Sequence, residues 1–371
     1  MEANITNSKS MGDIYRLIYQ NRECSRQDIE KQLEISLPTV TQNLNKLRRM
    51  GFIYNAGSFE STGGRKPTIL RCVPDARYAM GIDITKNHLS FVLIDLDLNI
   101  IENKRIRLTY EETAEYFQTI RTEAEGIIER NIAERDRLLG VGISMPALIG
   151  PSQKNITYAT VVHASRDIYE KLASCIDAPV LLFNDSNSAG LAESWRVRYT
   201  EPMVYLSLSN SVGGANMNGQ EIYTGVNWRG CEFGHMTIVP RGRRCYCGSY
   251  GCLDAYCSSN VLADFTGGDL KRFFAELKQG QNKGLQSVFD HYMDYLAIAV
   301  NNLRMCYDCD VVLGGYVGAF MGDYIDEFRQ RAVALNPFEQ DGSYIRVCHY
   351  KAEASAVGAA IYYINQFIQS F

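Results

Sequence analysis

The stretch from Cys231 to Cys257 holds the densest set of potential metal ligands in the chain, with five cysteines and one histidine in 27 residues. Four of them follow the pattern H-x9-C-x-C-x4-C: His235, Cys245, Cys247 and Cys252. One imidazole and three thiolates form the closed tetrahedral set typical of structural zinc, because a catalytic zinc keeps one position open. We therefore predict a structural Zn²⁺ on these four side chains. Cys231 and Cys257 are spare thiols that could compete for the ion.

The alternative chemistry for so many cysteines is a set of disulfides. The chain has 11 cysteines, an odd number that cannot all pair within one molecule. The N-terminus lacks a secretory signal and no apolar run is long enough for a membrane span, so we expect a soluble cytoplasmic protein with reduced thiols and no membrane partner. We interpret Cys306 and Cys309, an isolated C-x-x-C pair, as core thiols.

The first 74 residues contain three apolar-periodic segments, at 11–21, 25–33 and 36–51. Ser25 can cap the second helix, Ser36 and Pro38 can open the third, and Gly51 can end it. Only three residues, Glu-Ile-Ser, join the second helix to the third, which is typical of helix-turn-helix. This segment carries a net charge of +4 and the rest of the chain −8, a distribution that suits a nucleic-acid-binding head.

The third helix presents polar side chains on the side that we expect to face solvent. Short polar groups of this kind read base edges in the major groove, and the following Arg48 and Arg49 suit phosphates. The residues predicted to contact DNA on this helix are Pro38, Thr39, Thr41, Gln42, Asn43, Asn45 and Lys46. A helical protein-interaction module is the alternative interpretation of the same three helices.

Two strand-like runs, 52–54 and 68–73, flank a loop rich in glycine and serine directly after the third helix. This order indicates a wing. Its tip contains Gly63 and Gly64 followed by Arg65 and Lys66, and we predict that these two cations contact DNA. A solvated charged turn is the alternative.

From residue 75 onward, strand-like and helix-like runs alternate, which indicates an α/β fold. Runs at 80–84, 89–95 and from 100 onward predict an antiparallel opening, and a charged helix is expected over about 111–136. Further strands are expected at 138–146, 179–185, 203–210 and 310–315, with helices between them. The glycine pair that ends the strand at 310–315 lies at a carboxyl end, where ligands bind in such sheets.

The segment CEFGHMTIVPRGRRCYCGSYGCLDAY resembles the signature of the ROK family of repressors, open reading frames and sugar kinases. In that family a Glu-x-Gly-His segment leads into a Cys-x-Cys-Gly-x-x-Gly-Cys-x-Glu zinc loop. The resemblance covers essentially the whole chain and implies a winged helix-turn-helix followed by a two-lobed, actin-like ATPase (ribonuclease H-like) body. It implies a DNA-binding domain at 1–74, a first lobe at 75–190 with the C-terminal helix 355–371, and a second lobe at 191–354 carrying the zinc loop and the dimerisation surface.

The resemblance also implies a sugar site, whose orientation the zinc loop fixes. Glu232 and His235 come from the Glu-x-Gly-His segment, and a metal-bound imidazole keeps its other nitrogen as a fixed donor. Asn184 and Asp185 match the family's Asn-Asp pair, in which the Asp is the base of the kinases. Asp254 stands where the family usually has Glu, so its shorter side chain marks a different reach or sugar preference.

In this chain, the two segments that correspond to the phosphate loops of the family's kinases lack glycines that let backbone N–H groups approach phosphates. The first reads Asp-Ile-Thr-Lys-Asn (83–87) instead of Asp-x-Gly-Gly-Thr, and the second reads Ser-Asn-Ser-Val-Gly-Gly (209–214). Pro146-Ala147 replaces a Pro-Gly. We therefore expect no catalytic residue, with Asp185 as the vestigial base position, and no enzyme activity.

These observations predict a sugar-responsive DNA-binding transcriptional regulator, a repressor of carbohydrate-utilisation genes, with a degenerate kinase body that senses the effector. Its expected partners are operator DNA, a sugar or sugar derivative, and further copies of the chain in a homodimer or tetramer, since such regulators read paired half-sites. The alternative is an active ATP-dependent sugar kinase with an accessory DNA-binding domain. A body that dimerises and senses nothing is a third interpretation.

Overall fold

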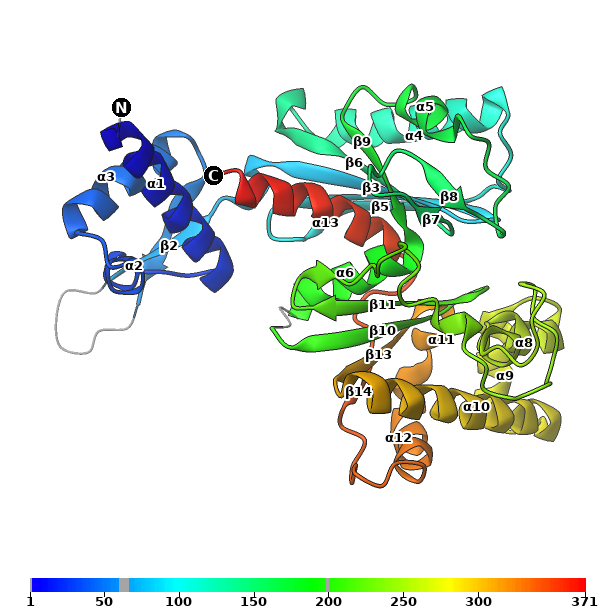
Figure 1. Cartoon of the computed structure of the whole chain (residues 1–371). Helices are drawn as coiled ribbons and strands as arrows, with labels where there is room; N and C mark the ends of the chain where they lie inside the picture. Colours follow the sequence, from blue (N-terminus) through cyan, green and yellow to red (C-terminus); the bar gives the residue numbers. More distant parts are fainter. Residues whose placement is uncertain (1, 60–66, 198–199) are drawn as a thin grey trace.

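The computed structural model describes residues 2–59, 67–197 and 200–371, which form a small head joined to a two-lobed body (Figure 1). The elements of the head are α1 (Glu2–Asn21), α2 (Arg26–Leu33), α3 (Leu37–Arg49), β1 (Ile53–Ser58) and β2 (Thr68–Cys72). The two strands pair antiparallel, as expected for a wing. The tip at 60–66, with the predicted DNA contacts Arg65 and Lys66, lies outside the described residues.

The predicted start and stop signals of the head are confirmed. Ser25 Oγ accepts a hydrogen bond from Asp28 N at 3.1 Å, and the Asp28 carboxylate accepts from Ser25 N at 2.8 Å, so α2 begins with a complete capping box. Pro38 lies in the first turn of α3, and Gly51 follows the helix with φ +76°. Only α1 differs, because it begins at Glu2 rather than near residue 11.

The first lobe contains a five-stranded sheet in the order β5-β4-β3-β6-β9. Its strands are β3 (Tyr78–Ile84), β4 (His88–Asp95), β5 (Ile100–Arg107), β6 (Leu138–Met145) and β9 (Val180–Asn184). The antiparallel opening is confirmed, and β3, β6 and β9 run parallel, so their carboxyl ends meet at one edge. Helices α4 (Ala114–Asn131) and α5 (Ile168–Ala173) cover one face, and α13 (Ala354–Gln369) covers the other (Figure 1).

The second lobe contains another five-stranded sheet, in the order β12-β11-β10-β13-β14. Its strands are β10 (Pro202–Leu208), β11 (Val212–Asn218), β12 (Glu221–Ile222), β13 (Asp310–Gly314) and β14 (Ile345–Val347). Helix α6 (Asp185–Val197) lies on one face, while α10 (Lys283–Tyr307) and α12 (Ile325–Val333) cover the other (Figure 1). The second predicted phosphate loop (209–214) overlaps this sheet, because β11 already begins at Val212.

Shorter elements complete the lobes. They are β7 (Leu148–Ile149), β8 (Ile156–Tyr158), α7 (Asp254–Cys257), α8 (Asn260–Ala263), α9 (Leu270–Gln279) and α11 (Gly315–Gly318). No helix of the described residues is both long enough and apolar enough to span a bilayer.

Helices α6 and α13 form the layer between the two sheets. The contact is close because Gly358 in α13 has no side chain: a Cβ there would lie 1.7 Å from the carbonyl oxygen of Ser188. Since α6 begins at Asp185, it crosses the predicted boundary between 75–190 and 191–354, and these domain limits remain a prediction.

The head packs directly on this layer, and buried side chains of the head, α6 and α13 belong to one continuous hydrophobic cluster. Tyr15 of α1 stacks on Phe371 at the end of the chain, with ring centroids 4.1 Å apart. Tyr19, also in α1, lies 6.3 Å from the Trp195 ring and donates a hydrogen bond to Leu96 O at 2.9 Å. The head is therefore fixed to the body by aromatic packing as well as by the linking chain.

Candidate functional site

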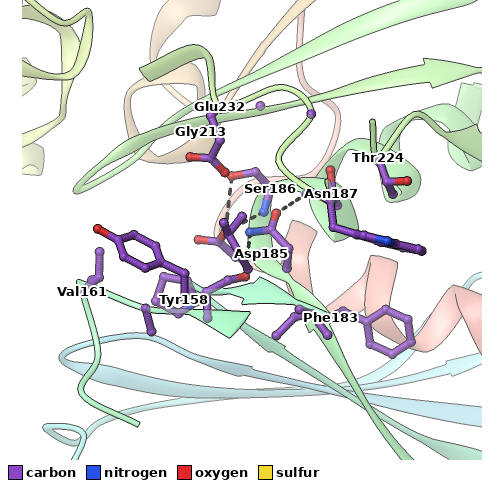
Figure 2. Close-up of a pocket in the computed structure, with 18 of the residues that line it drawn as sticks. Tyr158, Val161, Phe183, Asp185, Ser186, Asn187, Gly213, Thr224 and Glu232 are labelled. Carbon is purple, nitrogen blue, oxygen red and sulfur yellow. Dashed lines mark hydrogen bonds between the residues drawn. The ribbon is translucent and has the colours of Figure 1, made fainter. Parts of the chain in front are cut away.

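A cavity of about 330 Å³ lies between the two lobes, where β9 gives way to α6 (Figure 2). Side chains of the first lobe, such as Tyr158, line it together with Gly213 and Glu232 of the second. Asn184 is the last residue of β9 and Asp185 is the first of α6, so both lie at the carboxyl edge of the first sheet. This edge is where open α/β sheets bind ligands.

Of the five predicted sugar ligands, four line this cavity: Asn184, Asp185, Glu232 and His235. Asn184 is held by its neighbours, since its Nδ2 donates to Ala147 O at 3.1 Å and its Oδ1 accepts from Asn187 N at 2.9 Å. Asp185 Oδ1 accepts from Ser186 N at 2.7 Å, and burial raises the pKa of this carboxyl to about 6. Carboxylate, amide and imidazole groups on one wall can accept from and donate to several hydroxyls at once.

Glu232 is the second acid of the cavity. Burial raises its pKa, and the nearby Asp185 carboxylate raises it further. Two acids that share a buried site resist ionising together, so a ligand that brings hydroxyl donors stabilises the charged form of both.

Asp254 does not line the cavity. It is buried behind the β10–β11 turn, where its Oδ2 accepts a hydrogen bond from Val212 N at 2.6 Å, and burial raises its pKa to about 6. Its predicted place among the sugar ligands is therefore corrected: the shorter side chain holds the backbone of β11 instead.

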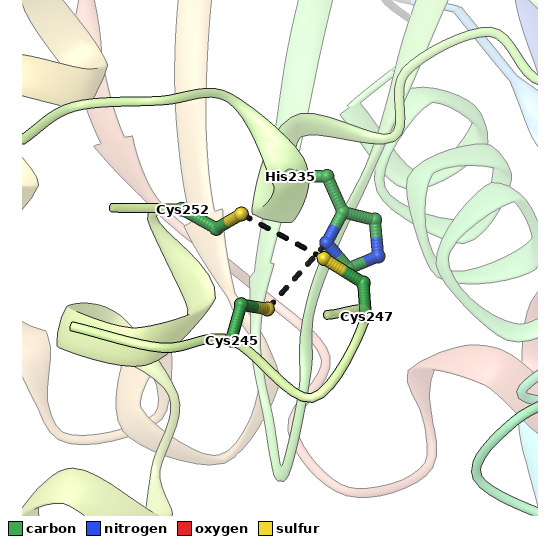
Figure 3. Close-up of side chains that lie close together, drawn as sticks. All are labelled: His235, Cys245, Cys247 and Cys252. Carbon is green, nitrogen blue, oxygen red and sulfur yellow. Dashed lines mark hydrogen bonds between the residues drawn. The ribbon is translucent and has the colours of Figure 1, made fainter. Parts of the chain in front are cut away.

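The predicted metal set does come together (Figure 3). The ligand atoms of His235, Cys245, Cys247 and Cys252 all lie within 4.8 Å of one another. Cys245 Sγ is 3.8 Å from His235 Nδ1, and Cys247 Sγ is 3.8 Å from Cys252 Sγ. A tetrahedron of sulfur atoms about 2.3 Å from a zinc ion has edges of about 3.8 Å, so the spacing and the donor types fit Zn²⁺.

His235 links the metal set to the cavity. Its Nδ1 faces Cys245, while its Nε2 lies 3.3 Å from the hydroxyl of Tyr246, and both residues line the cavity. Burial lowers the pKa of His235, which favours the neutral imidazole that binds metals.

The remaining cysteines behave in different ways. Cys231 and Cys257 are buried outside the metal set, and their sulfur atoms contact the carbonyl oxygens of Tyr223 and Tyr292. Cys309 is buried as predicted, but the interpretation of Cys306 as a core thiol is wrong, because this residue is exposed at the end of α10.

A second cavity, of about 400 Å³, continues from the first towards the predicted phosphate loops and shares Asp185 with it. Asp83 lies at its base, accepts a hydrogen bond from Ser144 Oγ at 2.8 Å, and has a pKa raised to about 7 by burial. Tyr316 of α11 also lines this space, and Arg105 Nη2 of the first lobe donates to its hydroxyl at 3.1 Å. Polar and aromatic side chains thus line the space beside the predicted phosphate loops.

On the head, the predicted DNA-contacting face is mostly accessible. Pro38, Gln42, Asn45 and Lys46 are exposed, while Thr39 and Thr41 are half-buried. Asn43 is a correction: it is 0% exposed, and its Nδ2 donates to Ser10 Oγ in α1 at 3.1 Å. Residues 40, 43, 44 and 47 share one face of the helix, so helical periodicity already contained this signal.

Several residues of the cavities were missed from the sequence. The sequence could have indicated Tyr246, because it lies between two predicted metal ligands. No sequence pattern pointed to Asn187, to Trp228 or to the Arg105–Tyr316 pair. Arg105 and Tyr316 are 211 positions apart, and only the packing of the lobes brings them together.

Comparisons with known proteins agree with this architecture. The protein-family model described as "ROK family" matches residues 79–366 of the sequence. A second family model, described as "Winged helix-turn-helix DNA-binding", matches residues 8–54. The chain is 24% identical over 306 residues to the xylose repressor of Bacillus subtilis (strain 168), covering 80% of this chain and 79% of the relative. It is 23% identical over 270 residues to the DNA-binding transcriptional dual regulator NagC of Escherichia coli (strain K12), covering 72% of this chain and 65% of the relative.

Among solved structures, a ROK family transcriptional regulator that is a homolog of the E. coli MLC protein superposes with a TM-score of 0.73 at 19% identity. The match covers 98% of this chain and 97% of that structure, so the two proteins have the same fold in the head and in both lobes.

Proposed function

The chain belongs to the ROK family, and from this membership we propose that it is a sugar-responsive, DNA-binding transcriptional repressor of carbohydrate-utilisation genes. The observation that carries the proposal is the presence, in one chain, of a helix α3 with an exposed polar face and a polar cavity between the lobes. The two relatives are named a xylose repressor and a DNA-binding transcriptional dual regulator, and this supports a regulatory role.

We propose that α3 binds the major groove of operator DNA through its exposed face. Gln42 and Asn45 offer amide groups for base edges, while Lys46 and Arg49 suit phosphates. The wing residues Arg65 and Lys66 add predicted contacts beside the groove. Because such heads read paired half-sites, the active form is a homodimer or a tetramer.

The effector is a sugar or sugar derivative that binds against Asn184, Asp185, Glu232 and His235. Clusters of fixed acceptors and donors around an enclosed cavity are the usual means of recognising hydroxyl groups. A Zn²⁺ ion on His235, Cys245, Cys247 and Cys252 supplies structural cross-linking of the loop. These four ligands hold the His235 ring, and with it the neighbouring Glu232, at a fixed distance from Asp185.

Helix α6 offers the physical route from the effector to the head. Its first turn contributes Asp185 to the cavity, and its last turn contributes Trp195, which contacts Tyr19 of α1. A helix of 13 residues is about 20 Å long and moves as a rigid rod, so a shift at one end reaches the other. We infer that sugar binding moves the lobes and α6 together and changes the spacing of paired heads.

The alternative, an active sugar kinase, is disfavoured by the second cavity. Thr85, Lys86 and Asn87 replace the backbone cradle of the first phosphate loop, and Tyr316 lies in the same space. Phosphoryl transfer depends on positioned phosphates and metal, so Asp185 alone does not supply it. An ATP-consumption assay with each sugar tests this point directly.

The test of the proposed function is a titration of fluorescent DNA from the region upstream of the gene, with and without xylose, glucose and N-acetylglucosamine. One of these sugars is expected to weaken DNA binding at least fivefold, within the usual range of allosteric coupling. Lys46→Ala should weaken DNA binding about tenfold, whereas Lys31→Ala, an exposed lysine on α2, serves as the matched control.

Asp185→Asn should abolish the sugar response while leaving the DNA affinity of the sugar-free protein intact. If no sugar changes DNA binding and ATP is consumed with a sugar present, the kinase alternative replaces the repressor.

A further inference from the structure

The effector cavity extends beyond the cluster of acids. Figure 2 shows Tyr158 and Val161 on one side of Asp185, and Phe183 and Thr224 on the other. The side with Phe183 leads away from the predicted phosphate loops, so the lost nucleotide does not account for it. A cavity of about 330 Å³ falls within the range of clefts that enclose drug-sized ligands, which leaves room for more than one sugar ring.

This extension contains a buried acceptor without a donor. Asn187, in the first turn of α6, lines the cavity, and among the described residues no donor lies within hydrogen-bonding distance of its Oδ1. An unpaired buried polar atom costs about 1–3 kcal/mol, a cost that a ligand hydroxyl removes. This Oδ1 has almost no accessible surface, so a ligand that reaches past Asp185 can donate to it only when the Asn187 side chain rotates towards the cavity.

Trp228, four residues after Thr224, adds an aromatic side chain to the lining of the cavity. Its side chain is 40% exposed and its backbone is in the left-handed region, with φ +57°. A non-glycine residue there is strained by about 1–3 kcal/mol and persists when the surrounding structure holds it. The loop does hold it, because Gly230 N donates to Thr224 O at 2.9 Å and Gly225 takes the positive φ of +73° that this turn requires.

We propose that Asn187, Thr224 and Trp228, with Phe183 beside them, form a second subsite that binds the second ring of a disaccharide. The first ring lies against Asp185, Glu232 and His235, so this inference rests on the proposed function. The flat apolar face of a sugar ring packs on the Trp228 indole. Its hydroxyls bind the Thr224 hydroxyl and donate to Asn187 Oδ1 once the Asn187 side chain has rotated towards the ligand. The natural effector is thus a disaccharide or a larger glycoside.

The chain carries its own reporter for this subsite. It contains two tryptophans, and Trp195 is only 5% exposed, so iodide in solution quenches the fluorescence of Trp228 selectively. The probes are three pairs: glucose with cellobiose, xylose with xylobiose, and N-acetylglucosamine with its β-1,4-linked dimer. Affinities are measured by calorimetry on the full-length protein, and iodide quenching is measured with each ligand.

For at least one pair, the disaccharide is expected to bind about tenfold more tightly than its monosaccharide, which corresponds to one stacked ring and one new hydrogen bond. It should also protect Trp228 from iodide more than the monosaccharide does. Trp228→Ala and Asn187→Ala should each reduce the ratio of the two dissociation constants towards one. Tyr223→Ala is the matched control, because Tyr223 is 56% exposed in the same loop but does not line the cavity.

Two outcomes separate the possible failures. Monosaccharides that bind as tightly as their disaccharides, with equal protection of Trp228, overturn the second subsite and leave the sugar-responsive repressor standing. If none of the six sugars binds, the proposed function and the subsite are both overturned.

Discussion

Individual buried acids determine how the cleft between the lobes responds to pH. Asp83, Asp185 and Asp254 all have pKa values raised by burial, and each keeps at least one hydrogen bond that partly offsets the cost. Asp83 has the highest value, about 7, because burial outweighs its hydrogen bond from Ser144 and the attraction of the nearby Arg105 guanidinium. A buried acid with a raised pKa is uncharged or easily protonated near neutral pH.

The pH dependence of stability should reveal Asp83. Because its pKa is raised in the folded protein, the cost of ionising it is absent below about pH 4 and fully present above about pH 7. The native protein should therefore lose stability as the pH rises from about 4 to about 7, and Asp83→Asn should remove part of that loss, up to about 4 kcal/mol at pH 8. The measurement is urea unfolding between pH 4 and 8.

The control for this experiment is Asp97→Asn, which changes an exposed aspartate in the same lobe. A pH profile of Asp83→Asn that parallels that of the native protein would show that Asp83 is ionised without cost.

At the scale of elements, the loop from His235 to Cys252 has almost no regular structure, and most of its order must come from cross-links. It follows the short helical turn Phe233–His235 and contains isolated bridges, such as the pairing of Thr237 with Cys252. In the proposed zinc site, four ligands on one ion replace the hydrophobic core that so short a segment cannot build. We therefore expect the loop to depend on the metal in a way that the sheets do not.

Loss of one ligand should therefore release the proposed metal and loosen the sugar wall. Cys247→Ser should reduce bound zinc from one ion per chain to near zero, as measured by mass spectrometry of the purified protein. The melting temperature should fall by about 10 °C, and sugar affinity should fall with it, because His235 loses its anchor.

Cys306→Ser is the matched control, since Cys306 is an exposed cysteine outside the metal set. Full zinc content and unchanged sugar affinity in Cys247→Ser would contradict the zinc site.

At the scale of the whole molecule, the head, α6 and α13 behave as one packed unit. The C-terminus contributes to it directly, because Arg16 Nη1 donates to Phe371 O at 3.1 Å. The guanidinium of Arg77 adds a contact with the head, 5.1 Å from the centroid of the Phe52 ring. Glu193 in α6 accepts hydrogen bonds from the backbone N–H groups of His349 and Tyr350, which ties the helix to the segment that leads into α13. We therefore expect motion of either lobe to reach the base of the head.

Trp195 is the point at which this unit should be sensitive. Trp195→Ala removes the contact between α6 and Tyr19 and should reduce the effect of sugar on operator affinity by about threefold to tenfold, as expected for a residue that carries coupling. DNA titrations with saturating sugar and without sugar measure this ratio.

Because Trp195→Ala also leaves a buried cavity, Trp195→Phe is the companion variant and should restore most of the response. A full sugar response in a folded Trp195→Ala protein would exclude α6 as the route.

The sequence by itself determined those features whose causes lie close together along the chain. Capping residues and apolar periodicity located the helices of the head, and the spacing of His235, Cys245, Cys247 and Cys252 predicted the metal set, because a loop of 18 residues has few other ways to gather four ligands. The motif that contains them also indicated the family and one acid of the cavity, Glu232.

Only the tertiary structure decided the features that depend on two distant segments. It buried Asn43 against α1, turned Asp254 towards Val212, and brought Asn187 and Trp228 into the lining of one cavity. The physical reason is that a local pattern specifies the backbone near it, whereas these contacts result from packing summed over both lobes. Which distant residue a side chain contacts is determined only when the helices and sheets have packed together.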